Sequence, residues 1–223
     1  MENKDTWDKV KDNISGWSLT LGTYFSRQLM VDPKHVLFTF ARYKFAAKLI
    51  GEDKKLEVLE LGCNEGVGSL MLSSFAKKVV AVDFDERAID WASGNLIKDN
   101  LSFIKADFLK EPIGKFDAVV SMDVIEHIPQ AEEDTYLQRV CDNLKDDGFC
   151  VIGTPNVTAS EYACEASKVG HINLFDAARL KALFEKKFKN VFIFGMNDEV
   201  VHTGFHPMCH FLVVLACNRK DVK

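Results

Sequence analysis

The fold is decided by the stretch Val58-Leu59-Glu60-Leu61-Gly62-Cys63-Asn64-Glu65-Gly66-Val67-Gly68, in which an apolar run ends in a turn rich in glycine. A helical pattern follows at once at Ser69-Leu70-Met71-Leu72. Strand, glycine turn and helix in this order are typical of the first unit of a doubly wound α/β domain. Glycine suits the turn because it reaches positive φ angles and lets a ligand approach bare backbone. The new helix offers unpaired N–H groups, so the stretch predicts a nucleotide-sized binding site.

The composition is that of one ordinary globular domain. The chain has 223 residues, 47% of them hydrophobic and 27% charged, which is enough for a full core. A net charge of −5 argues against nucleic acid as a partner. The polar start of the chain is followed by no apolar signal-like run, and no segment is long enough to cross a membrane. Six scattered cysteines without a C-x-x-C pair fit a reducing compartment, so we expect a cytoplasmic protein without a membrane partner.

From Glu57 onward, strand-like and helix-like segments alternate. The predicted strands are 57–61, 78–83, 101–105, 116–122, 148–153, 191–194 and 211–216, and the predicted helices are 66–75, 86–96, 132–144 and 176–188. Near-continuous Val, Ile and Leu in the strands indicate burial on both faces, and hence a Rossmann-like, mostly parallel sheet. No helical pattern separates the last two strands, which predicts an antiparallel hairpin at one edge.

Residues 1–50 depart from this alternation and are expected to form a helical cap on a domain at 51–223. A short amphipathic helix is predicted from the apolar residues Trp7, Val10, Ile14, Trp17, Leu19 and Leu21, and a second helix follows Pro33 as far as Ile50. The segment from Tyr24 to Phe45 is rich in aromatic and basic residues. It admits two interpretations, a cap packed on the sheet or a lid that closes over a substrate.

Acidic residues stand at the ends of the first three predicted strands. Glu60 opens an E-x-G-x-N-x-G-x-G spacing, which departs from the dinucleotide pattern G-x-G-x-x-G because Asn64 replaces the middle glycine. Asp83 ends the second strand, where an acid can accept hydrogen bonds from both ribose hydroxyls of a nucleoside. Asp107 ends the third, where it can meet the adenine amino group while Phe108 packs on the ring. The three acids together predict an adenosine site, although each alone is also a common helix cap.

These motifs, with Ser121-Met122-Asp123-Val124-Ile125-Glu126-His127, resemble those of class I S-adenosylmethionine-dependent methyltransferases over roughly residues 55–155. The resemblance implies a seven-stranded sheet with a reversed last strand. It also implies S-adenosylmethionine as cofactor, held by Glu60, Gly62, Asn64, Gly66, Asp83, Phe84, Asp107, Phe108 and Met122. The absence of a P-loop lysine agrees with a cofactor that carries no phosphate.

The acceptor side resembles small-molecule O-methyltransferases, including those of ubiquinone synthesis. The pattern Asp123-x-x-Glu126-His127 is similar to a motif that holds a divalent metal in some of them, which makes Asp123, Glu126 and His127 candidate ligands of Mg²⁺ or Mn²⁺. Thr154-Pro155-Asn156 and the segment 170–175 are similar to loops of sugar methyltransferases from bacterial surface-polysaccharide pathways. The resemblance therefore implies a small polar acceptor, most plausibly a nucleotide-linked sugar of capsule synthesis, with a phenol or quinone precursor as the alternative.

Two schemes for removing the acceptor proton remain open. His171 lies in a polar loop and is the favoured general base, with an ordinary pKa suited to the task. In the other scheme Asp123, Glu126, His127 and His171 hold a metal that acidifies the hydroxyl. His127 is equally consistent with a structural role at a helix start, and the later group His202, His206, Cys209 and His210 matches no four-ligand zinc spacing.

Two functions of other classes are weighed against this one. A nicotinamide oxidoreductase is disfavoured by Asn64 and by the reversed last strand. A cofactor-binding module without catalysis would not need the polar loops around Asp123 and His171. A homodimer is left open.

Overall fold

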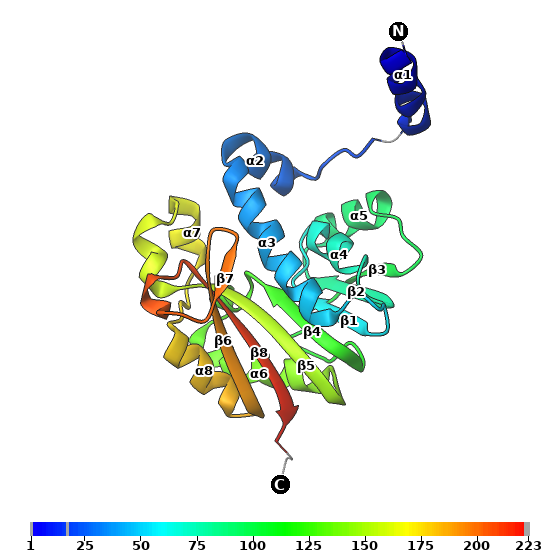
Figure 1. The fold of residues 1–223 in the computed structure, drawn as a ribbon. Coiled ribbons are helices and arrows are strands. Elements are labelled where there is room, and N and C mark those ends of the chain that lie inside the picture. The colour runs from blue at the N-terminus through cyan, green and yellow to red at the C-terminus, as the bar shows by residue number, and fades with distance from the viewer. Residues whose placement is uncertain (1, 17, 221–223) are drawn as a thin grey trace.

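The computed structural model describes residues 2–16 and 18–220 and contains one eight-stranded sheet in the order β3-β2-β1-β4-β5-β8-β6-β7 (Figure 1). The strands are β1 Glu57–Leu61, β2 Lys78–Asp83, β3 Leu101–Lys105, β4 Phe116–Met122, β5 Leu144–Pro155, β6 Phe188–Asn197, β7 Val200–His202 and β8 Phe211–Arg219. The first five run parallel, whereas β8 is antiparallel to both β5 and β6. The predicted fold class and the antiparallel pairing of the last long strands are confirmed. The short β7 adds an eighth strand, which pairs antiparallel with the end of β6.

Helices cover both faces of the sheet. The described helices are α1 Glu2–Ile14, α2 Thr23–Val31, α3 Pro33–Ile50, α4 Val67–Leu72, α5 Glu86–Asn95, α6 Glu133–Asp142, α7 Glu165–Gly170 and α8 Ala177–Glu185, with 3-10 turns at Ile125–His127, Gln130–Glu132, Val157–Tyr162 and His206–Met208. Buried residues of α3 and α4 pack on one face, where α5 also lies over β2 and β3. Those of α6 and α8 pack on the other. Strands with apolar contacts on both sides explain the continuous Val, Ile and Leu runs.

In the N-terminal segment, α1 lies apart from the sheet whereas α3 packs into the core. Helix α1 stands away from the sheet (Figure 1) and ends at Ile14, shorter than predicted, ahead of Gly16 at φ +91°. Trp17, which was included in the predicted helix, lies outside the described residues. Helix α3 instead joins the core, because Ala46 and Ala47 on it have no exposed surface. None of the described helices combines the length and the apolar character that a membrane span requires.

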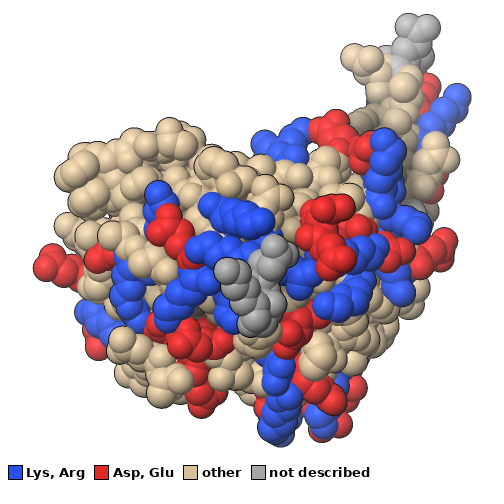
Figure 2. All heavy atoms as spheres, turned by 90° about the horizontal axis from the view of Figure 1, so that it is seen from below, with Lys and Arg blue, Asp and Glu red and all other residues tan. Residues whose placement is uncertain are grey.

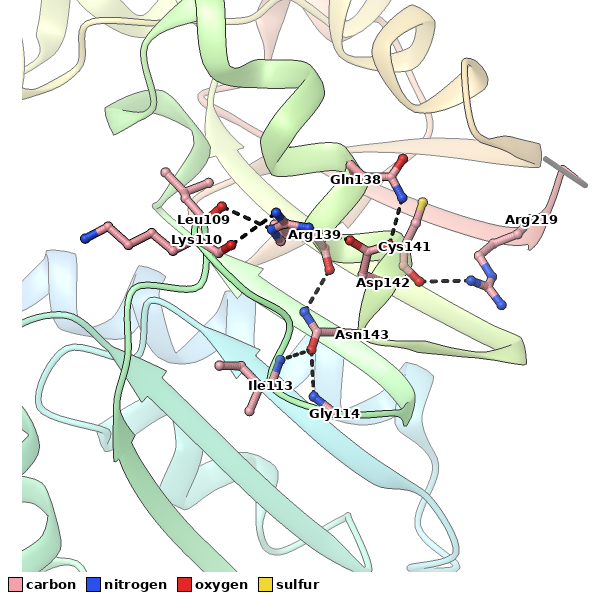
Figure 3. Close-up of polar contacts among 10 residues, drawn as sticks. All are labelled: Leu109, Lys110, Ile113, Gly114, Gln138, Arg139, Cys141, Asp142, Asn143 and Arg219. Atoms are coloured by element: carbon pink, nitrogen blue, oxygen red, sulfur yellow. Dashed lines mark hydrogen bonds and ion pairs between the residues drawn. The ribbon is translucent and has the colours of Figure 1, made fainter. Parts of the chain in front are cut away.

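The amino edge of the sheet is closed by a buried asparagine. Asn143 has no exposed surface, and its Oδ1 accepts hydrogen bonds from the backbone N–H groups of Ile113 and Gly114 at 2.7 and 3.0 Å. Its Nδ2 donates to the carbonyl of Arg139 at 2.8 Å, and the Arg139 guanidinium donates to the carbonyl of Leu109 (Figure 3). These bonds hold the loop before β4 on the end of α6.

Charged side chains of both signs are interspersed on the face seen from below, at this amino edge (Figure 2). Lys145, for example, lies 3.0 Å from a carboxylate oxygen of Asp117 and 3.4 Å from one of Glu57. Exposed pairs of this kind contribute little to stability.

Candidate cofactor and acceptor site

The glycine turn between β1 and α4 has the left-handed backbone that the sequence predicts. Gly62, Asn64 and Gly66 have φ angles of +78°, +48° and +72°. A Cβ on Gly62 would lie 2.4 Å from Val124, and one on Gly66 would lie 2.3 Å from Phe103. Both positions therefore require glycine for conformation and for space. Asn64 replaces a glycine without breaking the turn, because asparagine tolerates this region better than most residues.

Asp83 ties the end of β2 to this turn. One carboxylate oxygen accepts the backbone N–H of Asn64 at 2.8 Å and the other accepts that of Asp85 at 2.9 Å. A carboxylate has about four acceptor positions, so two remain for the hydroxyls of a ribose. The next residue, Phe84, is 75% exposed and is available to pack on a ligand. This geometry supports the predicted role of both residues, which stays a prediction.

The remaining predicted adenosine residues differ in how far they are buried. Asp107 is half-buried and pairs with Lys110 at 3.0 Å. Phe108 is buried in the core, with its ring edge-on to Tyr136 at 6.1 Å between centroids, which leaves little of it for an adenine ring. Met122 is likewise buried at the end of β4.

Glu60 has no exposed surface, and both of its oxygens are occupied. Tyr43 of α3 donates to Oε1 at 2.6 Å, and Ser69 of α4 donates to Oε2 at 2.5 Å. Burial raises the pKa of Glu60 to about 7. Any influence of Glu60 on the cofactor would therefore act through its buried charge.

Arg42 of α3 reaches across to Asp123 after β4. Its Nη1 lies 2.7 Å from both carboxylate oxygens of Asp123, which has a φ of +57°. The guanidinium also stacks over the ring of Phe211 at 3.8 Å from the centroid. Sequence reasoning placed Arg42 only in a basic, aromatic segment, since nothing local links it to a residue 81 positions away.

Three further residues converge beside this pair. Ligand atoms of Glu126, His127 and His171 lie within 4.8 Å of one another. The ring centroids of the two histidines are 5.1 Å apart. His127 Nδ1 is 2.8 Å from the carbonyl oxygen of Gly170. A carbonyl only accepts, so Nδ1 carries the proton of this hydrogen bond.

Burial governs the ionisation of this cluster. Glu126 is fully buried, Thr154 donates to its Oε2 at 3.1 Å, and Oε1 has no hydrogen-bond partner among the described residues. Burial and then the nearby Asp123 charge raise the pKa of Glu126 well above its usual range. Burial followed by the charge of His127 lowers the pKa of His171, so its neutral form predominates at pH 7. His35 of α3, which sequence reasoning did not select, also has its pKa lowered by burial and then by Arg42.

The cluster fits a divalent metal, although with a different membership from the predicted set. Among the described residues, Glu126, His127 and His171 could supply ligands, whereas Asp123 is paired with Arg42. The unpartnered, buried Oε1 of Glu126 is the observation that favours a cation there. One carboxylate and two imidazoles suit a first-row transition metal better than Mg²⁺. Such an ion would lower the pKa of a bound hydroxyl.

Comparison with known proteins decides among the alternatives. A family model described as a methyltransferase domain matches residues 35–187, which is well over half of the chain. This chain belongs to that methyltransferase family. The match includes the glycine turn, Asp83, Asp107 and the Glu126, His127 and His171 cluster, and it favours a methyl donor over a nicotinamide cofactor.

Named relatives define the class of the methyltransferase domain. A probable S-adenosylmethionine-dependent methyltransferase of Mycobacterium tuberculosis is 30% identical over 100 residues, covering 45% of this chain and 36% of that protein. A ubiquinone biosynthesis O-methyltransferase of Rickettsia akari is 28% identical over 115 residues, covering 49% and 44%. The chain thus spans less than half the length of these curated relatives. The methyltransferase domain is of the S-adenosylmethionine-dependent class, and S-adenosylmethionine is its cofactor.

A solved methyltransferase structure shares the fold. The N-methyltransferase NodS of Bradyrhizobium japonicum, in complex with S-adenosylhomocysteine, superposes with a TM-score of 0.61 at 17% identity, covering 86% of this chain and 90% of that one. At this identity the similarity concerns the fold alone.

Proposed function

We propose that this methyltransferase transfers a methyl group from S-adenosylmethionine to a hydroxyl oxygen of a small acceptor. The observation that carries the proposal is the pair of adjacent imidazoles, His127 and His171, beside the carboxyl ends of β4 and β5. The sulfonium of the donor is already activated. The protein must therefore align the hydroxyl, exclude water and accept a proton.

Either histidine is placed to accept that proton. The hydrogen bond from Nδ1 to the carbonyl of Gly170 orients the His127 ring, and the lowered pKa of His171 favours its neutral form at pH 7. The predicted base His171 is therefore joined by a second candidate. Asp123, the third predicted catalytic residue, is engaged in the ion pair with Arg42. The role of Asp123 would therefore be to hold α3 over the site.

We infer the acceptor class from the basicity of His171 and from the loops around it. A base with a pKa below about 6.5 is better matched to a phenol, with a pKa near 10, than to the much less acidic hydroxyl of a sugar. Ile172, directly after His171, is 61% exposed, and Val169 before it is 80% exposed. Apolar side chains beside the proposed base favour an acceptor with an aromatic or other apolar part. The O-methyltransferase name of the Rickettsia relative supports the same choice.

The sugar alternative rests on loops whose polar side chains have structural partners. Asn156 is buried and donates to the carbonyls of His206 and Cys209, both at 2.9 Å. Asn173 is buried and donates to the carbonyl of Ile128 at 3.0 Å. Since these amides are already satisfied, the motifs around them do not specify a sugar. A nucleotide-linked sugar of capsule synthesis is therefore the second candidate acceptor.

One experiment tests the reaction and the acceptor together. The protein is incubated with methyl-labelled donor and either hydroxylated phenols or a panel of nucleotide sugars, and products are identified by mass spectrometry. We expect methylated phenols. With an accepted substrate, His171→Ala and His127→Ala should each lower turnover, by about 10²–10⁴-fold for the residue that is the base. Affinity for S-adenosylhomocysteine should remain unchanged in both variants.

Chelation separates the two schemes for the proton. If a metal takes part, EDTA should abolish transfer and Mn²⁺ should restore it. If the histidines act alone, EDTA should have no effect. Near-normal turnover in both histidine variants, together with insensitivity to EDTA, would refute both schemes.

A further inference from the structure

Glu65, in the glycine turn, holds the start of helix α2. Its Oε1 accepts the backbone N–H of Tyr24 at 2.7 Å, and its Oε2 accepts that of Phe25 at 3.0 Å. The helix begins after Gly22, has no capping side chain of its own and has no acidic residue in its first turn. A carboxylate from a distant loop therefore supplies what an N-cap residue normally supplies, with a favourable charge at the positive end of the helix.

Gly22 shows how close this contact is. A Cβ at position 22 would lie 2.2 Å from the carboxyl carbon of Glu65. The φ of Gly22 is −67°, an angle that any residue adopts, so space for Glu65 is what requires glycine here. Glu65 itself is only 7% exposed. Both partners of this contact, Gly22 and Glu65, are therefore buried.

The same turn is connected to the cofactor site through hydrogen bonds from backbone N–H groups to side-chain oxygens. The N–H of Glu65 donates to Oδ1 of Asn64 at 2.6 Å, and the N–H of Asn64 donates to Asp83. Asn64 holds a left-handed conformation, which costs free energy unless its surroundings stabilise it. A cofactor bound to Asp83 and to the turn would add such stabilisation and would reduce the motion of Glu65.

On its other side, α2 is connected to the acceptor residues. Phe25 stacks on Phe40 of α3, with ring centroids 5.8 Å apart. Helix α3 carries His35 and Arg42, and Arg42 pairs with Asp123. Figure 1 places α2 above α3, over the edge of the sheet where β1 and β5 end.

We infer that Glu65 is a positioning residue that docks α2 on the cofactor turn, so that cofactor binding and the order of this lid helix are coupled. A role of this lid in methyl transfer to the acceptor rests on the proposed function. The coupling between cofactor binding and the order of α2 does not. Coupling is reciprocal, so the factor by which the cofactor protects α2 must equal the factor by which undocking α2 weakens cofactor binding.

The test uses the full chain and S-adenosylhomocysteine alone, so it needs no acceptor. Hydrogen exchange of the peptide covering α2 is measured with and without ligand, and affinity is measured by calorimetry. In the wild type, ligand should slow exchange at Tyr24 and Phe25 by about tenfold. Glu65→Ala should remove this ligand-dependent protection and weaken binding by the same factor. Glu65→Gln, which retains one acceptor oxygen, should lie between the two and covers the case in which the alanine variant fails to fold.

Two further variants separate docking from simple helix capping. In Gly22→Ser combined with Glu65→Ala, the serine hydroxyl can cap α2 locally, because the carboxyl group that occupied its space is gone. This protein should regain basal protection of α2 but not the ligand-dependent part. Asp176→Ala removes a comparable cap, since Asp176 accepts the N–H of Arg179 in α8 at 2.7 Å, and should leave the coupling unchanged.

The inference would be overturned by ligand-dependent protection that persists in Glu65→Ala or Glu65→Gln at the wild-type level. Its return in the double variant would also overturn it, because Glu65 would then be only a helix cap. Failure of the methylation assay would leave these exchange measurements unaffected.

Discussion

At the scale of single residues, Glu60 links the cofactor edge of the sheet to the pH dependence of folding. Burial raises its pKa from 4.5 to about 7, although Tyr43 and Ser69 both donate to the carboxylate. The folded protein therefore binds this proton more tightly than the unfolded chain does. The stabilisation that this raised pKa gives the folded state is complete below the pKa of Glu60 in the unfolded chain. It is lost as pH rises through the folded-state pKa of about 7.

Glu60→Gln should remove this part of the pH dependence. Without ligand, the free energy of unfolding of the wild type should fall between pH 5 and pH 8, and Glu60 should account for up to about 3 kcal/mol of the fall. The glutamine variant should show a correspondingly flatter profile in urea titrations at several pH values. Glu111→Gln, on an exposed loop, is the control. Parallel profiles for wild type and Glu60→Gln would contradict this account.

At the scale of elements, α3 serves two purposes along its length. The part of α3 up to Arg42 brings His35 and Arg42 toward the acceptor residues, and its use as a lid stays a prediction. Its second half buries Tyr43, Ala46 and Ala47 against the sheet, as the cap interpretation predicted. A Cβ on Gly68 of α4 would lie 2.0 Å from the Tyr43 ring, so the two helices are in close contact. The division of the chain at residue 50 stays a prediction, and α3 is packed as part of the domain core.

Deletions at the N-terminus should separate these roles. Removing residues 1–16 takes away α1, whose Trp7 and Ile14 are 61% and 58% exposed, and should change the unfolding free energy by less than about 1 kcal/mol. Removing residues 1–50 exposes the face that α3 covers and should abolish cooperative unfolding. Circular dichroism melts with and without S-adenosylhomocysteine would measure both. A folded protein that binds ligand after the longer deletion would show that α3 is dispensable for the core.

At the scale of the whole molecule, the two edges of the sheet differ in purpose. The carboxyl edge carries buried charges, left-handed turns and unpartnered polar atoms, which cost stability and are typical of functional sites. The amino edge is closed by the satisfied hydrogen bonds of Asn143 (Figure 3) and by mixed surface charge (Figure 2).

Asn143→Ala should therefore affect stability without affecting the site. It leaves the N–H groups of Ile113 and Gly114 without their acceptor and should lower the free energy of unfolding by about 2–3 kcal/mol. Affinity for S-adenosylhomocysteine, measured well below the melting temperature, should stay within twofold of the wild type. The exposed Asn190→Ala is the matched control. A large loss of ligand affinity in Asn143→Ala would mean that the two edges are coupled.

Local sequence indicated a mostly parallel sheet and the glycine turn, and the family motifs indicated the cofactor. Each of these depends on neighbours in the chain, because apolar runs select buried strands and positive φ selects glycine. The short β7 and the end of α1 at Ile14, ahead of Gly16, were not predicted.

Only the tertiary structure decided which distant side chains meet. Asp123, predicted as a metal ligand, is paired with Arg42, and Glu65 caps a helix 40 residues before it. Asn156 and Asn173, within loops that resembled a sugar site, are satisfied by backbone carbonyls. Sequence patterns carry no information about such pairings, because they depend on how α2, α3 and the loop after β5 pack over one edge of the sheet.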